Sequence, residues 1–283
     1  MTTFERNQVI RNDLLNEFDT IHRNKRNIKY SREFLEDYYS IMSLKAICVK
    51  YNISVPCITK RIEALNYPPK KSLNFHKVNY RVDEGFFEVI DTEAKSYFLG
   101  LLFADGFITK SNNVKRMGIS LNNRDKYMLE EFRKVLGADN PLTAQNEKDQ
   151  HRLLITSKKM FDDLYKLGCV TNKSLILKFP KEEDVPEHLV HHFIRGYFDG
   201  DGCIGVYGKH NTKCLSFAGT EHFLLQVKQE IANGACIEKG KIKKVKNIFI
   251  LSYHSREDIK KIGEYFYRNA TIFMKRKNDK FLI

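Results

Sequence analysis

The pattern of apolar and polar positions over residues 86–283 occurs twice, and each copy predicts the same order of helices and strands. In the first copy, a helix ends at YFLGLLFADG, and alternating residues predict strands at FITK and KRMGISL. A helix is expected over 125–136, strands around HRLLITS, and a helix over 158–167 that Gly168 ends. Residues 86–181 therefore form one complete module.

The second copy repeats this order over residues 182–283. It has a helix ending at FIRGYFDGDG, strands at CIGVYG and KCLSFAG, a helix over 221–231, strands at GKIKKV and NIFILSY, and a helix over 255–267. Asp105 and Asp201 hold the same place in the two copies, 96 residues apart. Two modules of this size predict a pseudo-two-fold axis.

The residues before the duplication predict a small helical domain over 1–67, followed by a basic linker over 68–85 with adjacent prolines. Residues 1–30 have apolar positions at near-helical spacing and predict an amphipathic helix. Two apolar stripes flank a turn at 52–54 and resemble a helix-turn-helix: Leu44, Ile47, Cys48 and Tyr51, then Ile58, Ile62 and Leu65. Thr59, Lys60 and Arg61 are expected on the outer face of the second helix, where they would contact DNA. A helical hairpin that only packs on its neighbour is the alternative.

Small residues four positions apart mark the end of each duplicated motif. Gly100 with Ala104, and Gly196 with Gly200, lie on one face of their helices, so the two helices can approach closely. Gly106 and Gly202 follow the aspartates and are expected in the left-handed conformation that ends a helix.

Asp105 and Asp201 are therefore predicted at the negative ends of two paired helices. If the helices are parallel, the two carboxylates converge and repel each other unless a cation lies between them. A hard divalent ion such as Mg²⁺ takes one or two carboxylates together with water and phosphate oxygens, which is the arrangement that phosphodiester hydrolysis needs. The pattern therefore predicts a catalytic metal site.

The composition adds a preference for polyanions. The 48 lysines and arginines exceed the 35 acidic residues, which gives a net charge of +13 and favours nucleic acid as a partner. The six cysteines form no C-x-x-C pair, no apolar leader opens the sequence, and no run is long enough for a membrane helix. We expect a protein that is not secreted, in the cytoplasm or the compartment that holds its target DNA.

The motifs YFLGLLFADG and FIRGYFDGDG resemble the paired motifs of the LAGLIDADG homing endonucleases, and residues 86–283 resemble the single-chain form of that family. The resemblance implies an α+β fold of two pseudo-symmetric αββαββα repeats. It also implies a monomeric, Mg²⁺- or Mn²⁺-dependent nuclease that hydrolyses one phosphodiester in each strand of double-stranded DNA, in the manner of intron homing. Metal binding falls on Asp105 and Asp201, assisted by the backbone carbonyls of Ala104 and Gly200.

The family also has a lysine late in each repeat, near the scissile phosphate. By resemblance these are Lys173 and Lys277, with Lys275 competing for the second place. Such a lysine stabilises negative charge on the phosphate or polarises the attacking water, and a plain phosphate-binding surface lysine is the alternative. Asp199 stands where the first motif has Phe103 and is not expected as a metal ligand.

Cations along the strands predict a surface that binds DNA phosphates and bases. They are Lys110, Lys115, Arg116 and Arg152 in the first repeat, and Lys209, Lys213, Lys241, Lys243 and Lys244 in the second. Ile119, Leu121, Phe217, Ile248 and Ile250 are expected to pack inward. Two other functions share these features: a regulator that binds DNA without cutting it, and an RNA maturase that helps an intron fold.

Overall fold

The computed structural model describes residues 32–39, 42–64, 69, 80–111, 114–145, 148–171, 173–209 and 211–282. The predicted helix over 1–30, and the predicted linker except for 69 and 80–85, lie outside these ranges, as do the side chains of residues 32, 33, 61, 64 and 174. The chain divides into two compact units, Met1–Tyr80 and Arg81–Ile283.

The described part of the smaller unit contains three short helices, α2 (Arg32–Tyr38), α3 (Leu44–Tyr51) and α4 (Val55–Ala64). Helix α3 begins at Ser43, whose hydroxyl accepts a hydrogen bond from the amide of Ala46, and ends at Asn52 in the left-handed conformation. Ile47, Ile58 and Ile62 are buried together with aromatic side chains of α2. The predicted stripes, apart from Leu65, which lies outside the described residues, are therefore in the core of this unit, and a tight turn joins the two helices.

The larger unit begins with repeat one. Its elements are α5 (Glu93–Ala104), β1 (Gly106–Ser111), β2 (Val114–Asn122), α6 (Lys126–Val135), β3 (Thr143–Gln145), β4 (Gln150–Thr156) and α7 (Lys158–Lys166). The strands form an antiparallel sheet in the order β1-β2-β4-β3. A short 3₁₀ helix, Lys173–Leu175, follows α7 and precedes repeat two.

Repeat two has the same order of elements. They are α8 (Glu187–Asp201), β5 (Gly202–Tyr207), β6 (Thr212–Gly219), α9 (Glu221–Ala235), β7 (Lys241–Val245), β8 (Ile248–Tyr253), α10 (Arg256–Tyr267) and α11 (Lys275–Leu282). Its sheet order, β5-β6-β8-β7, matches that of repeat one. The predicted α+β fold of two αββαββα repeats is confirmed, and α11 is an addition that the sequence pattern did not predict.

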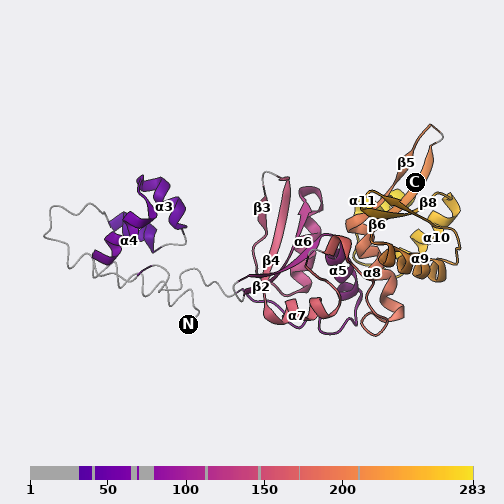
Figure 1. Ribbon diagram of the computed structural model, residues 1–283, viewed down its shortest axis with the longest axis horizontal. Helices are drawn as coiled ribbons and strands as arrows, with labels where there is room; N and C mark the ends of the chain where they lie inside the picture. The colour runs from indigo at the N-terminus through magenta and orange to yellow at the C-terminus, as the bar shows by residue number, and fades with distance from the viewer. Residues whose placement is uncertain are drawn as a thin grey trace. The chain divides into compact units, whose positions relative to one another are not determined.

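Helices α5 and α8 lie side by side at the centre of the larger unit, with the sheet of each repeat on either side of them (Figure 1). A Cβ atom on Gly100 would collide with the backbone carbonyl of Phe193, and one on Gly196 would collide with that of Tyr97. These two approaches are symmetric. Further toward the C-terminal ends, a Cβ atom on Gly200 would collide with that of Ala104, so the helices are parallel. The predicted close crossing is confirmed, and glycine is required at its two points of closest approach.

Gly106 and Gly202 correct one expectation. Neither has a positive φ, and Gly202 is extended (φ −86°, ψ 157°) because each glycine is the first residue of a strand. A Cβ atom on Gly106 would lie 2.7 Å from the Leu102 carbonyl oxygen, and one on Gly202 would lie 2.5 Å from that of Phe198. Lack of space, and not a left-handed conformation, is the reason for glycine here.

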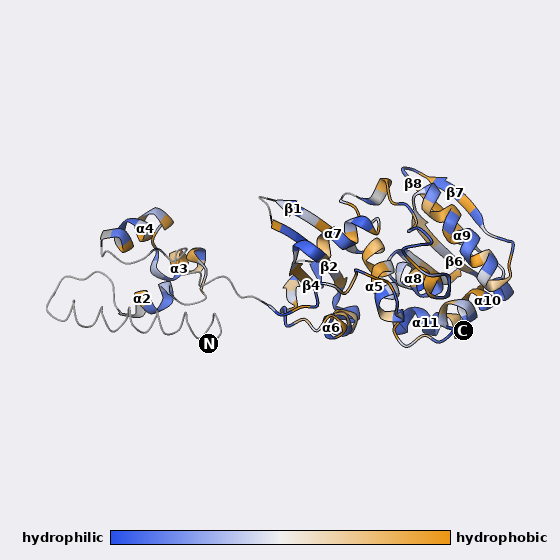
Figure 2. Cartoon of the chain, turned by 90° about the horizontal axis from the view of Figure 1, so that it is seen from below, coloured by the Kyte–Doolittle hydropathy of each residue, from blue (hydrophilic) through white to orange (hydrophobic). Residues whose placement is uncertain are grey.

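Each sheet has one face covered by helices. Helices α6 and α7 pack on β2 and β4, and α9 and α10 pack on the second sheet. These helices show both hydrophobic and hydrophilic colours, as helices with one buried side do (Figure 2). Ile119, Leu121 and Phe217 lie on the covered faces as predicted. We call the other face of each sheet, which carries no helix among the described residues, the open face.

The expectation for two isoleucines of β8 is wrong. Ile248 is 37% exposed, and Ile250 pairs in register with Lys243 and Ala218 on the open face. Because side chains alternate across a sheet, Phe249 and Leu251 are the residues of β8 that face the helices.

Replacing Gly196 with alanine should destabilise the protein. The added methyl group meets the Tyr97 backbone carbonyl, and overpacking of this kind costs about 1–3 kcal/mol, while alanine gains about 1 kcal/mol of helix propensity. Since backbone cannot rotate away as a side chain can, we expect the larger cost and a fall of about 4 °C or more in the midpoint of thermal unfolding. Gly85→Ala is the control, because its Cβ would meet no atom closer than 3.4 Å. A Gly196→Ala protein as stable as the wild type would contradict the crossing described above.

Candidate functional site

The two motif aspartates lie at the C-terminal ends of the paired helices. Asp201 is the last residue of α8, Asp105 follows the last residue of α5, and an Asp105 carboxylate oxygen lies 3.0 Å from where a Cβ of Gly200 would be. Both residues are partly open to solvent, yet the surrounding protein removes water from their carboxyl groups. Burial, and then the charge of Asp201, raises the pKa of Asp105 to about 6, and burial raises the pKa of Asp201. The short distance between the Asp105 carboxylate and the end of α8 places the two carboxyl groups close together, as predicted.

The two predicted lysines contact the same helix ends. The Lys277 ammonium donates to the carbonyl oxygens of Phe198 (2.5 Å), Asp199 (2.7 Å) and Gly202 (2.7 Å). Lys173 donates to the carbonyl of Gly106, which holds the equivalent place in repeat one. Burial lowers the pKa of Lys277 to about 8 and also lowers the pKa of Lys173. Lys277 is only 4% exposed, so it is not a plain surface lysine, whereas Lys275 is exposed.

Asp199 lies beneath this site and is fully buried. One of its carboxylate oxygens accepts hydrogen bonds from the Tyr97 hydroxyl (2.6 Å) and the Met274 amide (2.8 Å). Burial raises its pKa to about 6, which these hydrogen bonds oppose. Asp199 therefore connects α5, α8 and the segment before α11. Its carboxylate is buried, whereas a metal ligand at the helix ends would be open to solvent.

A buried ion pair that the sequence pattern did not predict lies at the other end of the helix pair. The Arg195 guanidinium is fully buried and donates to Glu93 of α5 (2.6 Å), to the Phe266 carbonyl (2.7 Å) and to Nδ1 of His192 (2.6 Å). Loss of hydration lowers the pKa of His192 to about 3, so the imidazole is neutral and accepts from Arg195. The signal in the sequence was an arginine within the motif FIRGYFDGDG, next to the crossing glycine.

The donor atoms at the helix ends fit a hard divalent cation. The charge of Asp201 raises the pKa of Asp105, so a positive charge between the two carboxylates would stabilise their ionised forms. The carbonyl oxygens of Ala104 and Gly200 lie on the preceding residues. The Gly200 carbonyl also accepts from Lys277 at 3.3 Å. Among the residues that the structure describes, no group of three or more His, Cys, Asp or Glu side chains is placed to hold a metal.

Some predicted DNA contacts lie on the open faces of the sheets. Arg116 is exposed, and the Arg152 guanidinium lies 5.6 Å from the ring centre of Phe107 while its Nε donates to Ser120 (3.0 Å). Lys241 and Lys243 are exposed on the second open face, opposite Ser252 and Ile250 in the register. Lys209 is exposed in the turn after β5. Arg116, Arg152, Lys241 and Lys243 therefore lie on the open faces of the two sheets.

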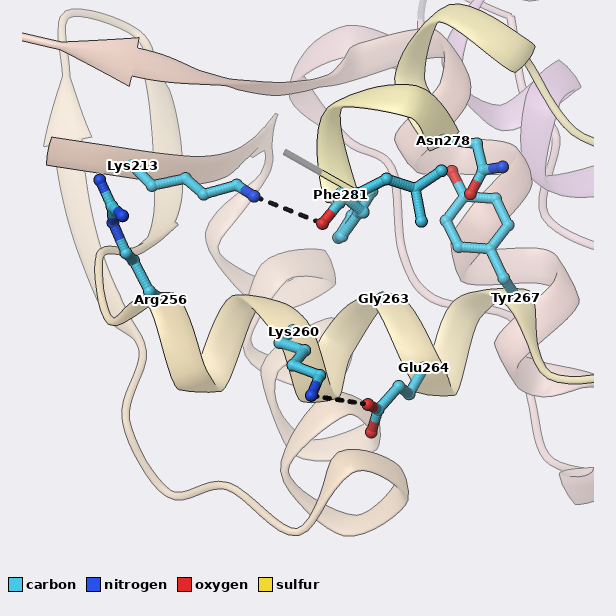
Figure 3. A pocket seen from close by; sticks show the side chains of 9 residues that line it. Lys213, Arg256, Lys260, Gly263, Glu264, Tyr267, Asn278 and Phe281 are labelled. Carbon is cyan, nitrogen blue, oxygen red and sulfur yellow. Dashed lines mark hydrogen bonds and ion pairs between the residues drawn. The ribbon is translucent and has the colours of Figure 1, made fainter. Parts of the chain in front are cut away.

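Four other predicted contacts lie on the helix-covered side of the register, although Lys110 and Lys244 are exposed there, and their contact with DNA stays a prediction. Lys115 pairs with Asp162 of α7, and Lys110 is its partner across the hairpin. Lys244 pairs in register with Phe249, whose ring centre lies 5.8 Å from its ammonium. Lys213 is directed toward the Phe281 carbonyl (3.4 Å), beside a cavity of about 540 Å³ between α10 and α11 (Figure 3). Alternation along each strand explains all four positions.

In the smaller unit, Thr59 and Lys60 are exposed on α4, and the Thr59 hydroxyl donates to the Val55 carbonyl (3.1 Å). The side chain of Arg61 lies outside the described residues. Within the described ranges, each helix is too short or too polar to cross a membrane.

Several solved structures are similar to this chain. The I-LtrWI LAGLIDADG homing endonuclease bound to target DNA is 14% identical, with 66% of this chain and 87% of that chain covered and a TM-score of 0.46. The LAGLIDADG meganuclease I-AabMI bound to uncleaved DNA is 10% identical, with coverages of 68% and 88% and a TM-score of 0.47. Meganuclease I-SmaMI bound to uncleaveable DNA is 12% identical, with coverages of 68% and 87% and a TM-score of 0.47. No curated protein matches the sequence.

Residues 92–167 match the family model described as a LAGLIDADG-like domain. The match extends from the cap of α5 to the end of α7, which is the greater part of repeat one. The chain therefore contains a LAGLIDADG-like domain, and repeat two has the same order of elements and the second motif. The family resemblance is confirmed over residues 92–167 by this match, and the predicted two-repeat fold is confirmed by the structure.

The affinity of the site for divalent metal should fall as the pH is lowered through about 6. A carboxylate must lose its proton to bind a cation, and below pH 6 Asp105 holds that proton, so binding weakens by about tenfold per pH unit for one proton displaced. Titration with Mn²⁺, followed by water-proton relaxation at pH 5 and pH 7.5, measures this. Asp105→Asn should remove both the affinity and its pH dependence. The control Asp163→Asn, on the surface of α7, should remove neither. Equal affinity at the two pH values would contradict the assignment.

Proposed function

We propose that this protein is a site-specific homing endonuclease that hydrolyses one phosphodiester in each strand of double-stranded DNA with a divalent metal, Mg²⁺ or Mn²⁺. The chain acts as a monomer, because its two repeats already supply both halves of a pseudo-symmetric site. The smaller unit, through Thr59, Lys60 and Arg61, adds a second contact with DNA.

The convergence of Asp105 and Asp201 supports this proposal most directly. Each carboxylate ends one of two parallel helices, and each helix leads directly into the first strand of its own sheet. Cations such as Arg116, Arg152 and Lys243 lie on the open faces of the two sheets. A duplex held on these faces places its phosphates beside the two carboxylates, and the pseudo-symmetry relates one repeat to each strand.

The side chains of the site have separable tasks. Asp105 and Asp201, with the carbonyls of Ala104 and Gly200, hold the cation, which neutralises charge on the phosphate and promotes ionisation of water when it is bound. Lys173 and Lys277 place positive charge at the helix ends and oppose the rise in the Asp105 pKa that burial causes. These lysines therefore favour the ionised carboxylates that metal binding needs.

Cleavage is tested with purified full-length protein, Mg²⁺ and plasmid DNA that contains randomised or host-locus sequence, with sequencing of all ends. We expect recurrent ends at one site, and a loss of at least about 100-fold in rate in Asp105→Asn and Asp201→Asn, since each removes an electrostatic group at the reacting centre. Asp163→Asn is the matched control and should cut at the wild-type rate.

Two other outcomes would replace this proposal. Tight, metal-independent binding at one DNA site without ends would indicate a regulator. Preferential binding of structured intron RNA, with acceleration of its folding and no DNA ends, would indicate a maturase.

A further inference from the structure

The segment that carries Lys277 is held largely by residues of the opposite repeat. Residues 268–277 lead from α10 into α11, and Lys277 lies in the first turn of α11. The backbone amide of Lys275 donates to the hydroxyl of Tyr127, which belongs to α6 of repeat one (2.9 Å). The position of the second lysine therefore depends on contacts made across the pseudo-two-fold axis.

The strongest of these contacts is a double hydrogen bond between Arg276 and Asp125. Arg276 Nε donates to Oδ1 of Asp125 (2.9 Å), and Nη2 donates to Oδ2 (2.8 Å). Asp125 is 3% exposed and stands at the N-cap of α6, yet its side chain makes no cap hydrogen bond. Other helices of the larger unit begin with serine or threonine hydroxyls that do accept this bond, at Thr92, Ser157, Thr220 and Ser255. Asp125 is thus directed to Arg276 instead of its own helix.

Glu93 and Asp199 hold the earlier part of the same segment. Glu93 of α5 accepts from the Thr271 amide (2.7 Å) and hydroxyl (2.7 Å) and from the Ile272 amide (3.0 Å). Asp199 accepts from the Met274 amide while Tyr97 of repeat one donates to the same carboxylate. Carboxylates fix the segment at three places before it reaches Lys277, and two of them, Glu93 and Asp125, belong to repeat one.

We propose that Asp125 in the first repeat is a positioning residue for Lys277 in the second repeat, and that it acts through the bidentate contact with Arg276. Arg276 precedes Lys277 directly, so the contact fixes the first turn of α11 and keeps the Lys277 ammonium beneath the carbonyls that end α8. The consequence for catalysis, which rests on the proposed function, is that residues of one repeat govern the reaction at the other half of the site.

Repeat one has a counterpart of different chemistry. Thr220, at the N-cap of α9 in repeat two, donates to the Leu177 carbonyl (2.6 Å), a few residues after Lys173, and still accepts its cap bond from Phe223. A neutral hydroxyl therefore stands where Asp125 has a carboxylate. Lys173 is only half-buried, in contrast to Lys277. Loss of the Asp125 carboxylate should change Lys277 and leave Lys173 as it is.

The test measures the reactivity of single lysines toward acetic anhydride in the intact full-length protein, without metal or DNA, by peptide mass spectrometry. The variant is Asp125→Ser, because serine is as good an N-cap as aspartate and cannot pair with a guanidinium. We expect the acetylation rate of Lys277 to rise about tenfold, which corresponds to about 1.4 kcal/mol, with the rate of Lys173 unchanged. Asp163→Ser removes an aspartate–lysine pair from α7 of the same repeat and should change neither rate.

An unchanged rate at Lys277 would overturn the proposal. A general loss of folding is recognised by faster acetylation of Lys173 and Lys277 alike. In that case the acetylation rates are measured in Arg276→Gln instead. This change removes the same contact at a side chain that is partly exposed, and so disturbs the fold less.

Strand-resolved cleavage gives a second readout once a target site is known. Under single-turnover conditions with each strand labelled separately, Asp125→Ser should slow one strand about tenfold, accumulate nicked DNA and leave the dissociation constant for DNA unchanged. Equal slowing of both strands would refute the one-sided effect. If the wild type cuts no DNA, the proposed function fails, while the acetylation rates still test the placement of Lys277.

Discussion

The close crossing of α5 and α8 is the constraint on which the rest of the larger unit depends. At Gly100 and Gly196 each helix presents its backbone to a carbonyl of the other, so the axes are nearer than side chains would allow. The contact fixes the two repeats relative to each other, and the two helices run in the same direction. It therefore brings two equivalent helix ends, with their acidic residues, to one place between the two sheets.

This arrangement concentrates negative charge, which must be balanced. Parallel helices bring their negative dipole ends together, and Asp105 and Asp201 add two carboxylates there. Burial and mutual repulsion raise the pKa of Asp105 to about 6, while Lys277 and Lys173 oppose that rise. The lysines satisfy carbonyls that end the helices and supply positive charge without neutralising the site fully. The negative charge that remains favours binding of a cation with oxygen ligands. This uncompensated charge lowers the stability of the protein at the place where the proposed chemistry occurs.

The sequence predicted the features that occur in both repeats and those that depend on residues close together in the chain. Two motifs in one register located the paired helices and the aspartates, because duplication makes equivalent positions visible, whereas Lys173 and Lys277 were indicated by the family resemblance. Strand faces were harder, since one residue of register decides whether Lys244 or Lys243 lies on the open face of the sheet. The hairpin that sets the register is not visible in the periodicity. Gly106 and Gly202 were assigned to the correct place for the wrong reason. Contacts such as Arg276 with Asp125, 151 positions apart, leave no local pattern, and only the folded chain shows them.

The two halves of the site share a fold but differ in what supports them. Beneath α8, Asp199 and Lys277 fill the space between the helix end and the segment before α11, whereas repeat one has Phe103 at the place of Asp199, 3.5 Å from a Cβ position on Gly168. An apolar ring and a hydroxyl contact tolerate small shifts, because neither depends on charge. A buried carboxylate and a bidentate guanidinium contact do not, since moving either partner leaves a charge without its hydrogen bonds. Repeat two is therefore held more rigidly around its lysine, and the rigidity is supplied by repeat one. In the proposed nuclease, whose single chain would face two different DNA strands, such a difference lets each half of the site be adjusted separately, which two identical subunits cannot do.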